Sequence, residues 1–166
     1  MAVGKLLPRM ARFQENHLSA LRADAYRRFP MLTVDFYNIP HTLRDRPQWL
    51  VWRLETRKGS KRPTKVPYNA LTGSHAKSND ASTWCGFEDA WRLVLRSDYD
   101  GVGFAFSEGD GLAGIDLDHA LDPDTGEVEP WAMDILEKFA GTYIERSPSG
   151  TGFRIYVLGS AIRSGK

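Results

Sequence analysis

The run Gly-Leu-Ala-Gly-Ile-Asp-Leu-Asp-His at residues 111–119 constrains the fold of this chain more than any other segment. Its apolar part predicts a buried strand that ends in Asp116 and Asp118, one residue apart, so both carboxylates lie on the same face of the extended backbone. Two anions this close repel each other unless a cation lies between them, and carboxylate oxygens suit Mg²⁺ or Mn²⁺ bound together with phosphates. The pattern therefore predicts a divalent-metal site for a nucleotide. The alternative is an acidic strand end that enters the loop at 119–126.

A single hydrophobic core fits a chain of 166 residues in which 42% are hydrophobic and 26% are charged. The only cysteine, Cys85, excludes an intramolecular disulfide framework and a cysteine-based zinc cluster, and is typical of a reducing compartment. No apolar run has membrane-spanning length, and the start of the chain lacks the apolar segment of a signal peptide. We therefore expect a cytoplasmic protein without a membrane partner. The residues expected in the core are the five tryptophans, Phe104, Phe106, Ile115, Leu117 and Ile155.

Charge is divided unevenly along the chain, although its net value is only +1. Residues 1–66 contain 14 Lys and Arg against 5 Asp and Glu, whereas residues 67–166 contain 8 against 16. This asymmetry predicts a polyanion-binding region beside a cation-binding site, which nucleic acid and a metal-bound nucleotide would satisfy. A solvated basic surface without a partner explains the basic half equally well.

The spacing of apolar and charged side chains divides the chain into an extension and a domain. A basic amphipathic helix is predicted at 9–29, ended by Pro30, so we expect residues 1–36 to be a helical extension and residues 37–166 to be the domain. Within the domain we expect strands at 49–54, 65–68, 101–106, 112–117, 142–145 and 153–158, and helices at 82–95 and 131–139. Ser82 or Thr83 would cap the first of these helices.

Two turns are predicted to close hairpins, a basic one at 57–62 and another at 107–111 that delivers the aspartates. The order strand, strand, helix, strand, strand, helix, strand, strand indicates an α+β fold. Its sheet would be mostly antiparallel or mixed and covered by helices.

The connection Arg146-Ser-Pro-Ser-Gly-Thr-Gly-Phe-Arg154 is rich in glycine and hydroxyl groups and has arginine at both ends. Glycines let backbone N–H groups converge on an anion, Ser147, Ser149 and Thr151 add donors, and Arg154 offers a planar fork for phosphate oxygens. The pattern predicts a triphosphate-binding loop. A plain hairpin turn would also use these residues.

Six motifs occur in one order and resemble the N-terminal domain of phage and plasmid primase-polymerases, which belong to the archaeo-eukaryotic primase superfamily. They are Arg46-Pro-Gln-Trp-Leu-Val-Trp, Thr64-Lys-Val-Pro-Tyr-Asn, Ala81-Ser-Thr-Trp, Gly101-Val-Gly-Phe, Gly114-Ile-Asp-Leu-Asp-His and Ser147-Pro-Ser-Gly-Thr-Gly-Phe-Arg-Ile. The likeness covers about residues 38–158. It implies an RRM-like core that binds metal-NTP or metal-dNTP and a single-stranded DNA template, makes or extends primers in replication, and works beside a helicase.

The resemblance also implies roles for individual residues. Asp116 and Asp118 match the family's metal motif and would be catalytic, holding Mg²⁺ or Mn²⁺ by the two-metal mechanism. The nucleotide-binding residues would be Ser147, Ser149, Gly150, Thr151, Gly152, Arg154 and Lys65. The nucleic-acid-binding residues would be Arg57, Lys58, Lys61, Arg62, Tyr68 and Asn69. Many superfamily members have histidine where Arg154 stands; arginine binds phosphate in bidentate fashion but cannot act as a titrating acid.

One departure from the family pattern keeps other functions open. The family's third motif, with another acidic residue, would follow Gly159, so we expect the domain to be incomplete at its C-terminal end; Glu145 is a spare carboxylate, but its position does not match. A non-catalytic remnant that binds single-stranded nucleic acid through basic residues and through Trp49, Trp52 and Tyr68 is the main alternative. An unrelated phosphohydrolase would need a helix directly after the aspartates, and residues 119–123 do not predict one.

Overall fold

The structure is a computed structural model that describes residues 35–56 and 63–159. The predicted helix at 9–29 and the predicted basic turn at 57–62 lie outside these residues. The described part is an α+β fold, as predicted, but its six strands form two separate three-stranded antiparallel sheets rather than one. No helix in the described ranges is long and apolar enough to cross a membrane.

The first sheet has the strand order β2-β1-β3, with β1 at Trp49–Glu55, β2 at Thr64–Tyr68 and β3 at Gly101–Phe104. All three strands agree with the predicted segments within a few residues. Helix α3, Phe87–Arg96, covers the face that carries Trp49, Val51 and Phe104. The predicted cap is wrong: Ser82 and Thr83 form the 3-10 helix η3 (Ala81–Thr83), which Asp80 caps, and α3 begins after Gly86.

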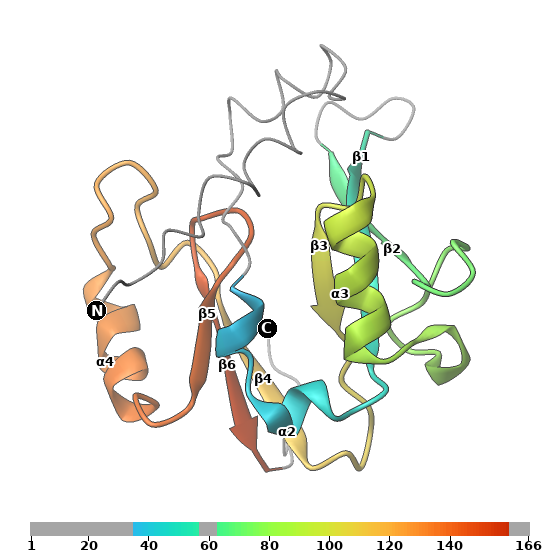
Figure 1. Cartoon of the computed structure of the whole chain (residues 1–166). Coiled ribbons are helices and arrows are strands. Elements are labelled where there is room, and N and C mark those ends of the chain that lie inside the picture. The colour runs from blue at the N-terminus through green and yellow to red at the C-terminus, as the bar shows by residue number, and fades with distance from the viewer. Residues whose placement is uncertain (1–34, 57–62, 160–166) are drawn as a thin grey trace, which may run out of the picture.

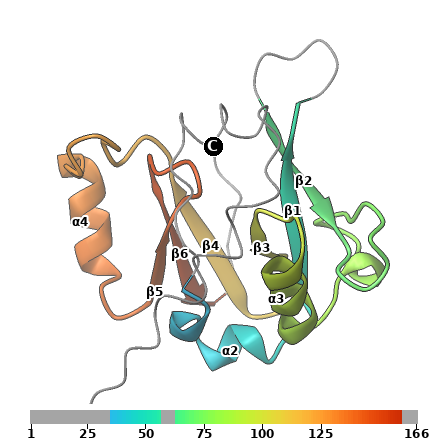
Figure 2. The ribbon, with the colours of Figure 1, turned by 45° about the horizontal axis from the view of Figure 1, so that its top comes forward.

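The second sheet has the strand order β4-β6-β5, with β4 at Leu112–Leu117, β5 at Tyr143–Arg146 and β6 at Phe153–Leu158. Helix α4, Pro130–Lys138, packs on one face of this sheet, where Ala132 meets Leu117 and Ile155. Figures 1 and 2 both show α4 on the side of this sheet that faces away from the first sheet. The opposite face of the second sheet carries Tyr143 and Tyr156, which belong to the main core, together with charged side chains.

The predicted second hairpin is wrong, because β3 pairs with β1 whereas β4 pairs with β6. The turn at 107–111 carries the chain from one sheet to the other. The Asp110 carboxylate accepts hydrogen bonds from the backbone N–H groups of Ser107 and Leu112, each at 2.8 Å. Gln48 Nε2 fastens this turn to β1 by donating to Ala105 O at 2.8 Å and to Asp110 Oδ2 at 2.9 Å.

The two sheets meet through aromatic side chains. Phe106 stacks on Tyr156 of β6 with ring centres 5.5 Å apart, and its ring meets Phe104 of β3 edge-on. Before β1 come η2 (Phe36–Asn38) and α2 (His41–Arg44), which contribute Phe36 and Leu43 to the core. The core therefore reaches at least one residue before the predicted start of the domain at 37.

The predicted core residues mostly lie where expected. Trp49, Trp52, Phe104, Leu117 and Ile155 are buried, and Trp84, Trp91, Phe106 and Ile115 are partly buried. Trp131 contradicts the prediction, because it lies on the outer side of α4 and is 47% exposed. Trp131 lies in the first turn of α4, directly after Pro130. The next residue, Ala132, faces the sheet, so the side chain of Trp131 points elsewhere.

Candidate nucleotide and metal site

A row of charged side chains crosses the second sheet. Because β6 lies between β4 and β5, Arg154 has Asp116 opposite it on one side and Glu145 opposite it on the other. Side chains alternate along strands, so Ile155 and Leu117 point to α4 and these three residues point to the opposite face. The sheet register thus places one cation between two carboxylates.

Arg154 forms an ion pair with the aspartate that the metal prediction rests on. Arg154 Nε donates to Asp116 Oδ1 at 2.7 Å, and Nη2 donates to Oδ2 at 3.4 Å. The two side chains are 37% and 59% exposed, so the pair contributes at most about 1 kcal/mol to stability. Burial by itself would lower the pKa of the Arg154 guanidinium, but its hydrogen bond to Asp116 raises the pKa above its ordinary value. The group therefore stays charged.

The second aspartate and the serine-rich loop come together at the end of β4. Asp118 follows the last residue of that strand, and His119 then turns the chain with a positive φ of 55°. Gly152 packs directly against this end: a Cβ added there would lie 2.2 Å from the carbonyl oxygen of Leu117. Only glycine permits that approach, so the loop at 147–152 adjoins Asp118.

The loop itself offers hydroxyl groups on its exposed side. Ser147 N–H donates to Gly152 O at 2.8 Å and closes the loop, and Gly150 has a positive φ of 76°. The hydroxyls of Ser147, Ser149 and Thr151 form a chain with O···O distances of 2.8 and 2.9 Å. An anion at this position could accept hydrogen bonds that the hydroxyls now exchange with one another.

Lys65 reaches this site from the other sheet. Burial is the main cause of a lowered pKa of its ammonium, and the nearby Arg154 lowers the pKa further, while Asp116, Glu145 and Asp118 oppose the shift. The residue as a whole is exposed, but Nζ lies 5.3 Å from the ring centre of Trp52. The end of its side chain is therefore partly desolvated and lies within electrostatic reach of the charged row.

Glu145 is a member of the site that the sequence did not assign. Tyr156 OH donates to Glu145 Oε1 at 3.0 Å, and Tyr143 OH donates to Oε2 at 3.2 Å. Burial raises the pKa of the Glu145 carboxyl, against the opposing effects of these hydrogen bonds and of Arg154. The signal that reveals Glu145 is the pairing of β5 with β6, which the sequence pattern does not specify.

The structure does not bring every predicted binding residue to this site. Tyr68 and Asn69 are buried; Tyr68 OH is bonded to Arg53, Glu55 and His75. Asn69 Oδ1 accepts from the backbone N–H groups at 71 and 72, which shapes the turn after β2. These two side chains serve the fold. Arg57, Lys58, Lys61 and Arg62 lie outside the described residues.

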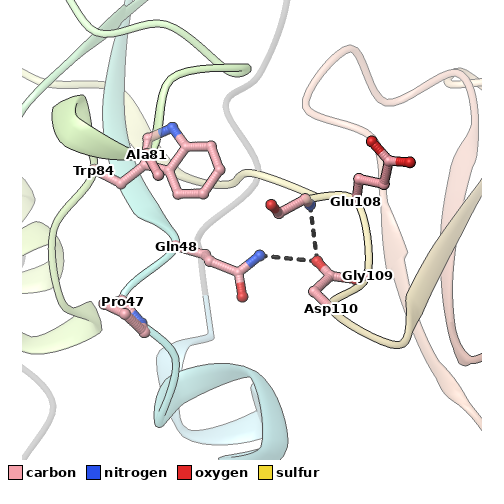
Figure 3. Close-up of a pocket in the computed structure, with 8 residues that line it drawn as sticks. Pro47, Gln48, Ala81, Trp84, Glu108, Gly109 and Asp110 are labelled. Carbon is pink, nitrogen blue, oxygen red and sulfur yellow. Dashed lines mark hydrogen bonds between the residues drawn. The ribbon is translucent and has the colours of Figure 1, made fainter.

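A surface depression of about 430 Å³ lies elsewhere, beside the turn that joins the sheets. Figure 3 shows Trp84 and Pro47 on one side of it and Glu108, Gly109 and Asp110 on the other. Its lining includes none of the residues of the charged row. Gln48 and Asp110, which are hydrogen-bonded to each other, are among the residues that line it.

The acidic residues fit a metal ion that arrives with phosphates. Among the described residues there is no group of three or more His, Cys, Asp or Glu that could hold an ion, so the chain offers the two exposed carboxylates of Asp116 and Asp118. Mg²⁺ usually keeps several waters and uses one or two carboxylates plus substrate phosphates. The donor set therefore suits Mg²⁺ or Mn²⁺ together with a triphosphate.

The fold and the site define an α+β domain of two small antiparallel sheets with a carboxylate and arginine row beside a glycine-rich loop. No protein-family model matches the chain. A curated protein, the DNA primase-polymerase of Nitratiruptor phage NrS-1, is 36% identical to it over 112 residues. This match covers 68% of the chain and 15% of the phage protein. The chain belongs to the primase-polymerase family, and it spans about 15% of the length of this relative.

Proposed function

We propose that this domain binds a nucleoside triphosphate together with Mg²⁺ or Mn²⁺ and serves nucleotidyl transfer to a DNA primer on a single-stranded template. One observation carries the proposal: Asp116 and Arg154 lie opposite each other on adjacent strands, and the Gly152 loop packs against the end of the strand that carries Asp116, although two separate motifs supply these residues. The similarity to a protein named DNA primase-polymerase supports the same reading. Whether the sugar is ribose or deoxyribose is left to experiment, and a helicase partner stays a prediction.

Each side chain has a role that follows from its place. Asp116 and Asp118 would hold the ion, which when bound polarises phosphate oxygens and activates the attacking 3′ oxygen. The hydroxyls of the loop at 147–152 and its backbone N–H groups would hold the triphosphate, and Arg154 and Lys65 would balance its charge. Glu145 lies opposite Arg154 on the side away from Asp116 and would act on the guanidinium through its charge.

The first test measures triphosphate binding to the 166-residue chain with Mn²⁺ by calorimetry or with a fluorescent analogue. We expect Asp116→Ala and Asp118→Ala each to weaken Mn²⁺-dependent binding about tenfold or more, because a charged metal contact is lost. Asp134→Ala, an exposed acid on α4, is the matched control and should leave binding unchanged. Equal affinities in all four proteins would contradict the proposal.

The second test is primer extension with Mn²⁺, run on this chain and on a version extended through the downstream reading frame. Extension that Asp116→Ala abolishes, in either length, supports the proposal. A longer protein that extends primers equally well with and without Asp116 would exclude these carboxylates from the chemistry.

The alternative is a domain that binds single-stranded nucleic acid without catalysis. It is favoured by the charge of residues 1–66, which contain 14 Lys and Arg against 5 Asp and Glu. It predicts binding whose affinity falls steeply with salt, because counterions are released, and which responds neither to Mg²⁺ nor to Asp116→Ala. Measuring the affinity for a single strand with and without Mg²⁺ separates the two functions.

A further inference from the structure

The geometry points to a second role for Arg154, which rests on the proposed function. We propose that the Arg154 guanidinium competes with the metal ion for Asp116, so that a metal ion alone binds weakly and a triphosphate relieves the competition. Arg154 would thus couple the two ligands of the site, in addition to contacting one of them.

The competition follows from the atoms that the ion pair uses. Arg154 engages both oxygens of Asp116, at 2.7 and 3.4 Å, and a metal ion held by Asp116 requires at least one of them. A guanidinium and a divalent cation also repel each other across one carboxylate. A metal ion that binds Asp116 must therefore displace the guanidinium or bind despite its positive charge.

The pair is placed so that it can open. Arg154 and Asp116 are 37% and 59% exposed, and ion pairs this accessible to water are weak. On β5, the strand on the other side of β6 from β4, Glu145 lies opposite Arg154, so a second carboxyl group stays near the guanidinium when Asp116 is taken by an ion. Arg154 would leave Asp116 without leaving the site.

A triphosphate supplies the competing partner for Arg154. The residue lies two positions after Gly152, at the end of the loop that adjoins Asp118. A planar guanidinium binds phosphate oxygens in bidentate fashion, as it binds the carboxylate. Once Arg154 turns to phosphate, both oxygens of Asp116 are free for the ion. By linkage, each ligand then raises the affinity for the other by the same factor.

The first experiment measures Mn²⁺ binding without nucleotide by the electron paramagnetic resonance signal of the free ion. We expect Arg154→Gln to bind Mn²⁺ about fivefold or more tightly than the wild type, at the lower end of common coupling factors. Lys65→Gln is the matched control, because it removes a positive charge that acts on the same carboxylates without a direct hydrogen bond to Asp116. If Lys65→Gln gains as much Mn²⁺ affinity as Arg154→Gln, the gain comes from the loss of any positive charge near the carboxylates. That result would overturn the proposal.

The reciprocal experiment measures binding of inorganic triphosphate in EDTA, where no metal takes part. Asp116→Ala frees Arg154, so we expect tighter binding than in Asp118→Ala, which removes an equal charge but no ion pair. Equal gains in both variants would overturn the competition while leaving the proposed function intact. If the wild type shows no triphosphate binding with Mn²⁺ at all, the proposed function fails and the competition fails with it.

Discussion

Gly152 shows how one residue sets the position of the candidate phosphate loop. The carbonyl oxygen of Leu117 occupies the space where a Cβ would stand, at 2.2 Å. Glycine here is a packing requirement as well as a source of loop freedom. The sequence pattern Gly-Thr-Gly indicated a phosphate loop. It did not indicate which of the two positions must be glycine because it packs against β4.

A substitution at Gly152 tests this contact. We expect Gly152→Ala to lower the free energy of unfolding by about 1–3 kcal/mol, because the obstacle is a backbone atom within a paired strand. It should also weaken triphosphate binding. Gly141→Ala, at a position with open space around the added Cβ, is the control for both measurements by urea denaturation and calorimetry. Equal stability of the two variants would contradict the close approach.

Glu145 gives a second test at the scale of a single residue, through pH. Its folded-state pKa is raised, chiefly by burial, so the folded protein holds this proton more tightly than the unfolded chain. As pH rises above the unfolded value near 4.5, the unfolded chain loses the proton first, and stability falls until the folded pKa is passed. Glu145→Gln has no such loss.

We therefore expect the stability of Glu145→Gln relative to the wild type to increase as pH rises from about 4 towards 7. Thermal or urea unfolding across this range measures it. Glu137→Gln, on the exposed side of α4, is the control and should track the wild type. A difference between Glu145→Gln and wild type that does not change with pH would contradict a raised folded pKa.

At the scale of elements, the spacing of apolar side chains and the turn residues closely predicted the strands and the helix at 130–138. They did not predict that β3 pairs with β1. The turn at 107–111 has glycines with positive φ at 109 and 111, as a hairpin turn would. The segment before and within this turn is hydrogen-bonded to Gln48, which is far away in the sequence, and no local pattern encodes that contact. The same limit hid Glu145, whose partner strand the sequence did not name.

The crossover can be tested through Gln48. Replacing it with Met keeps the volume but removes the side-chain donor to Ala105 O and one of the donors to the Asp110 carboxylate, so we expect the free energy of unfolding to fall by about 1–3 kcal/mol. Glu108→Gln, exposed in the same turn, is the control. Urea denaturation compares the two variants. A variant at Gln48 as stable as the control would show that the clamp contributes little.

At the scale of the whole molecule, the candidate site depends on how the two sheets are joined. Lys65 belongs to the first sheet, whereas Asp116, Asp118 and Arg154 belong to the second or follow it. Phe106 forms the junction, because its ring stacks on Tyr156 and lies over Gly114, where a Cβ would be 2.8 Å from the ring. Gly114, two residues before Asp116, therefore leaves space for the ring of Phe106.

Phe106→Leu keeps an apolar side chain but removes the stacked ring, and we expect a loss of about 1–2 kcal/mol in the free energy of unfolding. Triphosphate affinity with Mn²⁺ should also fall, since Lys65 is no longer held beside the charged row. The decisive measurement is a double-mutant cycle with Lys65→Gln, because removing Lys65 should matter less once the junction is loosened. Leu158→Ala, 77% exposed on β6, is the control. Additive losses of affinity in the double mutant would mean that the position of Lys65 does not depend on the junction.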